Sequence, residues 1–231
     1  MLKAEIVLWL LASIYGLEIT DAAKAFDAKQ AKNDLQKKID YLIVASITDW
    51  RDTHIILSIM HNNASLVFQT KLTQELHDVR LAVQTAHENG RDASYCIEDT
   101  NNTLRALKQD AELKFSECDA AGWKYFKNNY NIMAKILQTG YTALKEIENI
   151  HNICWSRISY LVHCRAERIK IASYYVQSFE DKWKMHPVYR KQIFIKMLNK
   201  YAKCLKTNIN EEMKKVTAFR PISKSCVDGA E

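Results

Sequence analysis

Helix-breaking residues are scarce in this sequence. Only five glycines and two prolines, Pro187 and Pro221, occur among its 231 residues. Proline and glycine interrupt regular structure more often than other residues do, so most of the chain carries nothing that would stop a helix. We therefore expect long helices and no sheet.

Local catalytic and metal-binding motifs are also missing. The sequence contains no GxSxG, HExxH or CxxC motif and no glycine-rich phosphate loop. Its seven histidines are scattered, and His54 and His61 lie two helical turns apart, which is too far for a helical metal pair. We expect no enzyme, no cofactor and no metal site. A hydrolase whose catalytic groups meet only on folding is kept as a minor alternative.

The chain has only one long apolar run, and it is too short to cross a bilayer. The run covers residues 6–15, follows Met1-Leu2-Lys3 and ends at Gly16. A membrane span needs about 20 apolar residues, whereas a positive lead, a short apolar run and a small residue form a secretory signal peptide. We expect residues 1–16 to be a signal peptide, with cleavage possible up to residue 22, and no transmembrane anchor. A buried N-terminal helix is the alternative.

Cysteines and sequons agree with secretion. Disulfides persist mainly in oxidising compartments, and an even number of cysteines suits a disulfide framework. We expect all six to be paired: Cys96, Cys118, Cys154, Cys164, Cys204 and Cys226. The sequons Asn63-Ala64-Ser65 and Asn101-Asn102-Thr103 predict glycosylation at Asn63 and Asn101. Together with the leader, these features predict a secreted, extracellular glycoprotein.

Six cysteines allow 15 connectivities, and helix geometry narrows them. On a straight helix Cys96 and Cys118 would lie about 33 Å apart, and Cys154 and Cys164 about 15 Å apart, so neither pair should bridge. We favour Cys118 with Cys154, across an antiparallel helix pair. A zinc site is the alternative, but no ligand spacing supports it.

Apolar residues recur at helical spacing in three stripes. The longest contains Phe126, Tyr130, Met133, Leu137, Gly140, Leu144 and Ile147. The second contains Leu198, Ala202, Leu205, Ile209, Met213 and Val216, and the third Leu72, Leu76, Val79 and Val83. These stripes, with the turn residues between them, predict helices at about 24–60, 66–88, 93–117, 121–150, 152–184 and 188–218.

Turn residues at 61–63, 88–90, 120–122 and 186–187 are expected to separate these helices. Short connections make neighbouring helices fold back on each other. The predicted fold class is all-α: an elongated antiparallel helical bundle, partly coiled-coil and braced by disulfides. We expect residues 17–231 to form a single helical domain, with a loose C-terminal tail after about residue 218.

Charge is divided unevenly along the chain. Residues 1–120 hold 13 Lys or Arg against 18 Asp or Glu, a net −5, whereas residues 121–231 hold 20 against 9, a net +11. Lys196, Lys200 and Lys203 recur at helical spacing beside the second stripe, which should face inward. The three lysines are therefore candidates for binding polyanions. The alternative is a solvated helix face neutralised by the acidic half of the chain.

A family resemblance rests on cysteines and tyrosines in the C-terminal half. The residues Cys154-Trp155, Tyr160, Cys164 and the segment Tyr201-Ala202-Lys203-Cys204-Leu205 resemble insect secreted helical proteins, especially the family named after the tsetse midgut EP protein. Arthropod salivary or venom helical proteins are similar to about the same degree. The resemblance implies a leader, amphipathic helices and a Tyr-x-x-Cys motif, and it supplies no catalytic residue.

Two main functions remain open from sequence. The first is an extracellular binding or interaction protein whose partners are anionic glycans, anionic lipid surfaces or a hydrophobic, lipid-like ligand in an inter-helix groove. The second is a membrane-active effector, a toxin or an antimicrobial, whose basic amphipathic helices lie at anionic lipid surfaces. Nucleic acid is not an expected partner of an extracellular protein.

Overall fold

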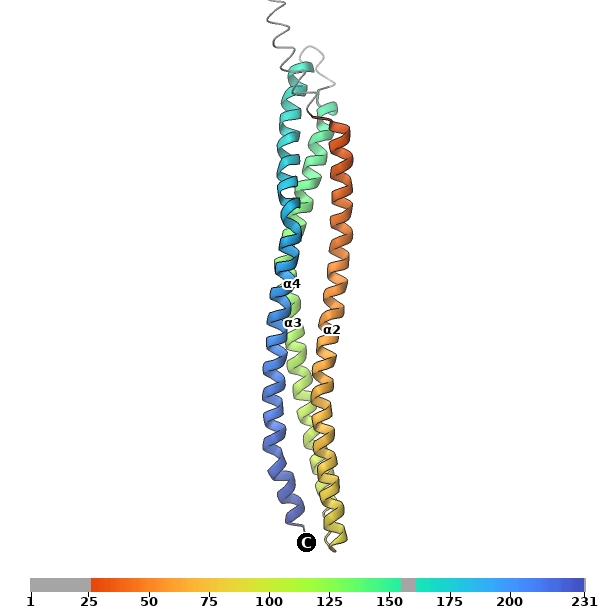
Figure 1. Ribbon diagram of the computed structural model, residues 1–231, viewed down its shortest axis with the longest axis vertical. Coiled ribbons are helices and arrows are strands. Elements are labelled where there is room, and N and C mark those ends of the chain that lie inside the picture. Colours follow the sequence, from red (N-terminus) through yellow and green to blue (C-terminus); the bar gives the residue numbers. More distant parts are fainter. Residues whose placement is uncertain (1–25, 155–160, 231) are drawn as a thin grey trace, which may run out of the picture. The chain divides into compact units, whose positions relative to one another are not determined.

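The structure, a computed structural model, describes residues 26–154 and 161–230 of the chain. Within these ranges it contains three long α-helices, α2 (Ala28–Glu88), α3 (Tyr95–Asn152) and α4 (Leu161–Asp228), and no strand (Figure 1). The all-α, disulfide-braced bundle predicted from the sequence is confirmed. The predicted signal peptide lies outside the described residues.

The described residues divide into two compact units. Of the described residues, unit 1 contains 26–49, 130–154 and 161–191, and unit 2 contains 50–129 and 192–230. Each unit contains one segment of each helix, so each is a three-helix bundle with its own core.

Contacts between helices give the same topology in each unit. In unit 1, Lys32 of α2 pairs with Glu148 of α3, and further along α2 Asp49 meets Tyr130, so these helices are antiparallel. In unit 2, α2 and α4 are parallel, because Leu57 contacts Tyr201 and the later Glu75 pairs with Arg220. Antiparallel pairing through α3 is what short connections between long helices predict.

Three of the four predicted breaks are absent. Residues 61–63 lie inside α2, residues 120–122 inside α3 and residues 186–187 inside α4. The six predicted helices therefore merge into three. Only the turn after Glu88 is present, where Gly90 adopts a positive φ of 79°. Gly122 is buried against Tyr201 and Leu57, so its role is packing and not termination.

Helix α4 continues through Pro187 because a side chain replaces a lost hydrogen bond. Proline has no N–H, so the carbonyl of Trp183, four residues earlier, loses its usual donor. The Nδ1 atom of the buried His186 lies 2.7 Å from that carbonyl oxygen and can donate to it. The histidine beside the proline therefore allows the helix to continue.

The apolar stripes predict most of the core. In the longest stripe, Phe126, Tyr130, Met133, Gly140 and Ile147 are buried, and the other two members are half-buried. Three members of the third stripe are buried. The stripe in the C-terminal part of α4 is partly wrong: Ala202 is exposed, and the inward positions are those of Met197, Tyr201 and Leu205.

All six cysteines are paired, but two predictions about connectivity are wrong. The bridges are Cys96–Cys226, Cys118–Cys204 and Cys154–Cys164. Cys118 thus pairs with Cys204 of α4 and not with Cys154. The Cys154–Cys164 bridge forms because α3 ends at Asn152, so the two cysteines do not share the straight helix on which the distance argument rested.

The predicted loose tail after residue 218 is also incorrect. Helix α4 runs on to Asp228 and passes through Pro221. The Cys96–Cys226 bridge holds this last part of α4 against the start of α3, and Val227 and Ala230 join a small apolar cluster with Val83 and Ala86. Burial of these apolar side chains keeps the C-terminal segment ordered.

Candidate functional site

The most strongly charged stretch of the chain lies on α4. Between Asp181 and Glu211 the helix contains no acidic residue and eight basic ones: Lys182, Lys184, Arg190, Lys191, Lys196, Lys200, Lys203 and Lys206. The last four belong to unit 2 and are all exposed. None of these four makes an ion pair within the described part of the chain.

Three of these lysines form a row on one side of α4. Lys196, Lys200 and Lys203 are separated by four and three residues, so they follow one another along the helix surface. The Nζ atom of Lys200 lies 4.2 Å from the ring centroid of Tyr125 on α3, a cation–π contact that places the row beside α3. We call these three residues the lysine row.

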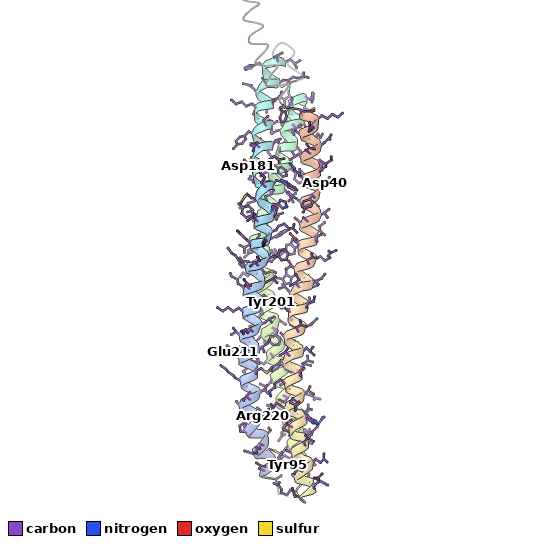
Figure 2. The ribbon with its side chains drawn as sticks, in the orientation of Figure 1. Asp40, Tyr95, Asp181, Tyr201, Glu211 and Arg220 are labelled. Carbon is purple, nitrogen blue, oxygen red and sulfur yellow. A yellow bond between two sulfur atoms is a disulfide. The ribbon has the colours of Figure 1, made fainter. Side chains whose placement is uncertain are left out.

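The backbone beneath the lysine row is held by a disulfide and a buried tyrosine. Cys204, next to Lys203, is bonded to Cys118 of α3. Tyr201 belongs to the part of α4 that lies in unit 2 (Figure 2). Its hydroxyl donates to Asp119 of α3 and lies 3.1 Å from the carbonyl oxygen of Leu57 on α2. The lysine side chains are therefore presented from a fixed segment of helix.

Burial raises the pKa of the Tyr201 phenol, and the hydrogen bond to Asp119 raises it further. Tyr201 therefore stays protonated at physiological pH and acts as a donor within the core. Its hydroxyl links α4 to both other helices of unit 2 and fixes the rotation of α4. This rotation places the lysine row outside the core.

Other cations of α4 are neutralised by acidic residues of α2 and α3. In unit 1, Arg190 donates to Asp49, which also accepts from Tyr130, and the Asp49 hydrogen bond raises the pKa of Arg190. In unit 2, Arg220 pairs with Glu75, and Lys215 pairs with Asp110. Acidic residues from the first half of the chain thus neutralise Arg190, Lys215 and Arg220. The lysine row has no such partner within residues 26–154 and 161–230.

A polar cluster in unit 2 contains the residue types of a hydrolase without its geometry. His61 lies between two carboxylates, 3.3 Å from an oxygen of Glu112 and 2.9 Å from one of Asp119. The Ser65 hydroxyl donates to Glu112. In a Ser-His-Asp triad the serine hydroxyl donates to the histidine, whereas the Ser65 hydroxyl donates to a carboxylate. The cluster therefore joins α2 to α3.

Two hollows on the surface have charged linings. One, of about 280 Å³, lies in unit 2 beside Glu75 and Arg220, and the other, of about 530 Å³, lies in unit 1 beside Lys32 and Glu148. A lipid-like ligand would need a mainly apolar lining. Apolar atoms make up the larger part of both linings, with charged side chains among them, so the linings do not exclude such a ligand. The described residues contain no group of three or more His, Cys, Asp or Glu side chains able to hold a metal ion.

The two predicted glycosylation sites lie on different helices of unit 2. Asn63 is exposed on α2, while Asn101 is half-buried on α3. Sequence reasoning identified both sequons but could not tell that Asn63 lies on the outer side of an unbroken helix. Its neighbour Ser65 faces inward.

No family model, no curated protein and no solved structure matches the chain. The resemblance to the tsetse midgut EP family stays a prediction. None of the helices in the described ranges is long and apolar enough to cross a membrane.

Proposed function

We propose that this chain is a secreted interaction protein that binds extracellular polyanions or anionic lipid surfaces through the lysine row. One observation carries the proposal: three exposed lysines, without ion-pair partners in the described chain, are held on one side of a helix segment that has no acidic residue between positions 182 and 210. The three disulfides and the signal-peptide pattern support placement outside the cell.

The helix spacing sets how the row meets a ligand. Lys196 and Lys203 are separated by about 10 Å along the helix axis at 1.5 Å per residue. An anionic surface or an extended polyanion can contact all three ammonium groups at once. Each contact near such a surface contributes on the order of 1 kcal/mol and weakens beyond a Debye length of about 8 Å at physiological salt.

Salt-dependent retention on heparin and on vesicles of anionic phospholipid tests the proposal. We expect the triple variant K196Q/K200Q/K203Q to bind on the order of a hundredfold more weakly at low salt. The matched control is R80Q/R105Q/K108Q, which removes three exposed charges of unit 2 that lie on other helices. Equal losses in the two variants would show that net charge, and not the lysine row, governs binding.

A membrane-active effector is the second candidate, and one observation favours it. Ile195, next to Lys196, is exposed on α4. An exposed aliphatic side chain beside lysines is the arrangement of helices that insert at the headgroup region of anionic membranes. Leakage of a dye from anionic vesicles, lost in Ile195→Asn but with heparin retention unchanged, would favour the effector over a binding protein.

A further inference from the structure

Helix α2 contains a long uncharged segment in a charge-rich protein. Asp, Glu, Lys and Arg make up 26% of the chain, yet none occurs in the 18 residues from Thr53 to Thr70. The segment lies in unit 2 and is helical throughout. One side of it faces the core through Leu57, Ala64 and Phe68, which are buried. The opposite side would ordinarily carry charged residues.

The outer side of this segment is apolar and exposed. Ile55, Ile59 and Leu66 are 47%, 53% and 63% exposed, and Asn62 lies between the last two. Spacings of four, three and four residues place all four on one line along the helix. We call Ile55, Ile59, Asn62 and Leu66 the α2 strip. Single exposed aliphatic residues are common, but an uncharged row of them marks a contact surface.

We propose that the α2 strip is the face through which two copies of this chain pack together, with their α2 helices antiparallel. A two-fold axis between residues 60 and 61 sets Ile55 of one copy opposite Leu66 of the other, and Ile59 opposite Asn62. Such a contact is isologous, because the same patch serves both copies. It buries six aliphatic side chains, three from each copy.

The two-fold register of the α2 strip, together with its lack of charge, favours a second copy as the occupant. The chain carries a net charge of +6, so two copies that met through the lysine row would repel each other. The α2 strip brings no charges together, and the charged residues that precede it, Arg51 and Asp52, would lie opposite Thr70 and Gln69 of the other copy. A strip that is uncharged over its whole length is complementary to itself.

In this proposal, association through the α2 strip depends on whether Asn63 carries a glycan. Asn63 is exposed and directly follows Asn62, so it lies at the border of the α2 strip. A glycan on Asn63 would occupy the space that the second helix needs. The chain should therefore pair when Asn63 is bare and stay monomeric when it carries a glycan.

Sedimentation velocity of the secreted protein over a range of concentrations tests both parts. We expect wild type that carries a glycan at Asn63 to sediment as a monomer, and Asn63→Gln as a dimer. In the Asn63→Gln background, Ile59→Lys should weaken the dimer roughly a hundredfold, because symmetry places the added charge in the interface twice. Leu113→Lys is the matched control, since Leu113 is 61% exposed and lies on α3 instead of α2.

Each remaining outcome overturns the proposal. An Asn63→Gln protein that is monomeric at every concentration shows that the strip does not bind its own copy. A dimer that Ile59→Lys leaves intact, or that Leu113→Lys weakens equally, uses another face. A glycosylated wild type that dimerises through Ile59 shows that the glycan does not block the contact. Circular dichroism checks that each variant keeps its helices.

Discussion

The two units share a topology but are held together differently. In unit 2, Cys96–Cys226 and Cys118–Cys204 tie α3 to α4 at two places. In unit 1 the Cys154–Cys164 bridge only closes the connection between consecutive helices. Unit 1 relies instead on close packing at Gly140 and on the buried hydrogen bonds from Tyr130 and Arg190 to Asp49.

This difference shows that covalent links and tight packing can serve the same purpose. A disulfide acts mainly on the unfolded chain, by removing conformations that would otherwise compete with the fold. Close packing acts on the folded chain, through dispersion contacts that tolerate little change of volume. The lysine row lies on α4, which the disulfides tie to α3, whereas the α2 strip lies on the helix of unit 2 that contains no cysteine.

The largest effect should come from removing a long-range disulfide. The chain-entropy relation assigns about 4.6 kcal/mol to Cys118–Cys204, with a sequence separation of 86, and about 2.7 kcal/mol to Cys154–Cys164, with a separation of 10. We expect C118A/C204A to lower the free energy of unfolding more than C154A/C164A does. Urea unfolding measures the two losses, and hydrogen exchange locates each in its unit. A reversed order would contradict the account of unit 2.

Glycine substitutions should have effects of intermediate size and opposite sign in the two units. A Cβ on Gly140 would lie 2.9 Å from both Ile39 Cγ1 and Phe179 Cε2. A Cβ on Gly122 would have Tyr201 Cδ2 as its nearest neighbour, at 3.4 Å. Gly140→Ala should cost about 1–2 kcal/mol through overpacking. Gly122→Ala should gain about 0.5–1 kcal/mol from helix propensity. Thermal unfolding of both variants checks the signs.

The smallest effect should be a dependence of unit 2 on acid. Hydrogen bonding from Arg220 holds the pKa of Glu75 below its usual 4.5 despite burial, so the folded chain keeps this carboxylate charged where the unfolded chain takes up a proton. The contribution of the Glu75–Arg220 pair to the free energy of unfolding is complete above the pKa that Glu75 has in the unfolded chain. It is lost as the pH falls through the lowered pKa of the folded chain. Wild type should therefore lose stability on acidification, and Glu75→Gln less so.

Urea midpoints at neutral pH and at about pH 3 measure this difference, since the window lies below the ordinary carboxylate pKa. The control is Glu117→Gln, because Glu117 is exposed on α3 of the same unit. If the Glu75→Gln and Glu117→Gln proteins respond to acid alike, the pair with Arg220 does not set the acid response.

Much of the fold could be predicted from local sequence patterns, and the predictions that were wrong failed for physical reasons. The stripe from Phe126 to Ile147 predicted a buried face because helical periodicity is a local property. The predicted break at 186–187 was wrong because the His186 side chain replaces the hydrogen bond that Pro187 cannot donate to the Trp183 carbonyl. The sequence alone does not show which rotamer His186 adopts. The Cys118–Cys154 prediction was wrong because the break expected at 120–122 is absent, so that Cys118 lies within α3. The exclusion of Cys154–Cys164 was wrong because α4 begins only at Leu161, so the two cysteines do not share a helix.

The candidate site was predicted less completely. Exposure of Lys196, Lys200 and Lys203 follows from spacing, and the structure confirms it. The ion pairs that neutralise other cations could not be predicted, since Glu75 and Arg220 lie 145 residues apart in sequence. The uncharged segment of α2 is visible in the sequence. Its outward orientation became clear only once residues 61–63 proved to be helical.

The pairing of the four cysteines in unit 2 has a consequence for a protein exposed to proteases. A single cut in α4 between Cys204 and Cys226 leaves both fragments joined to α3, one through Cys118 and the other through Cys96. A cut in α3 between Cys96 and Cys118 likewise leaves both pieces joined to α4. A nicked molecule can therefore keep its helices in place and migrate as one band until its disulfides are reduced.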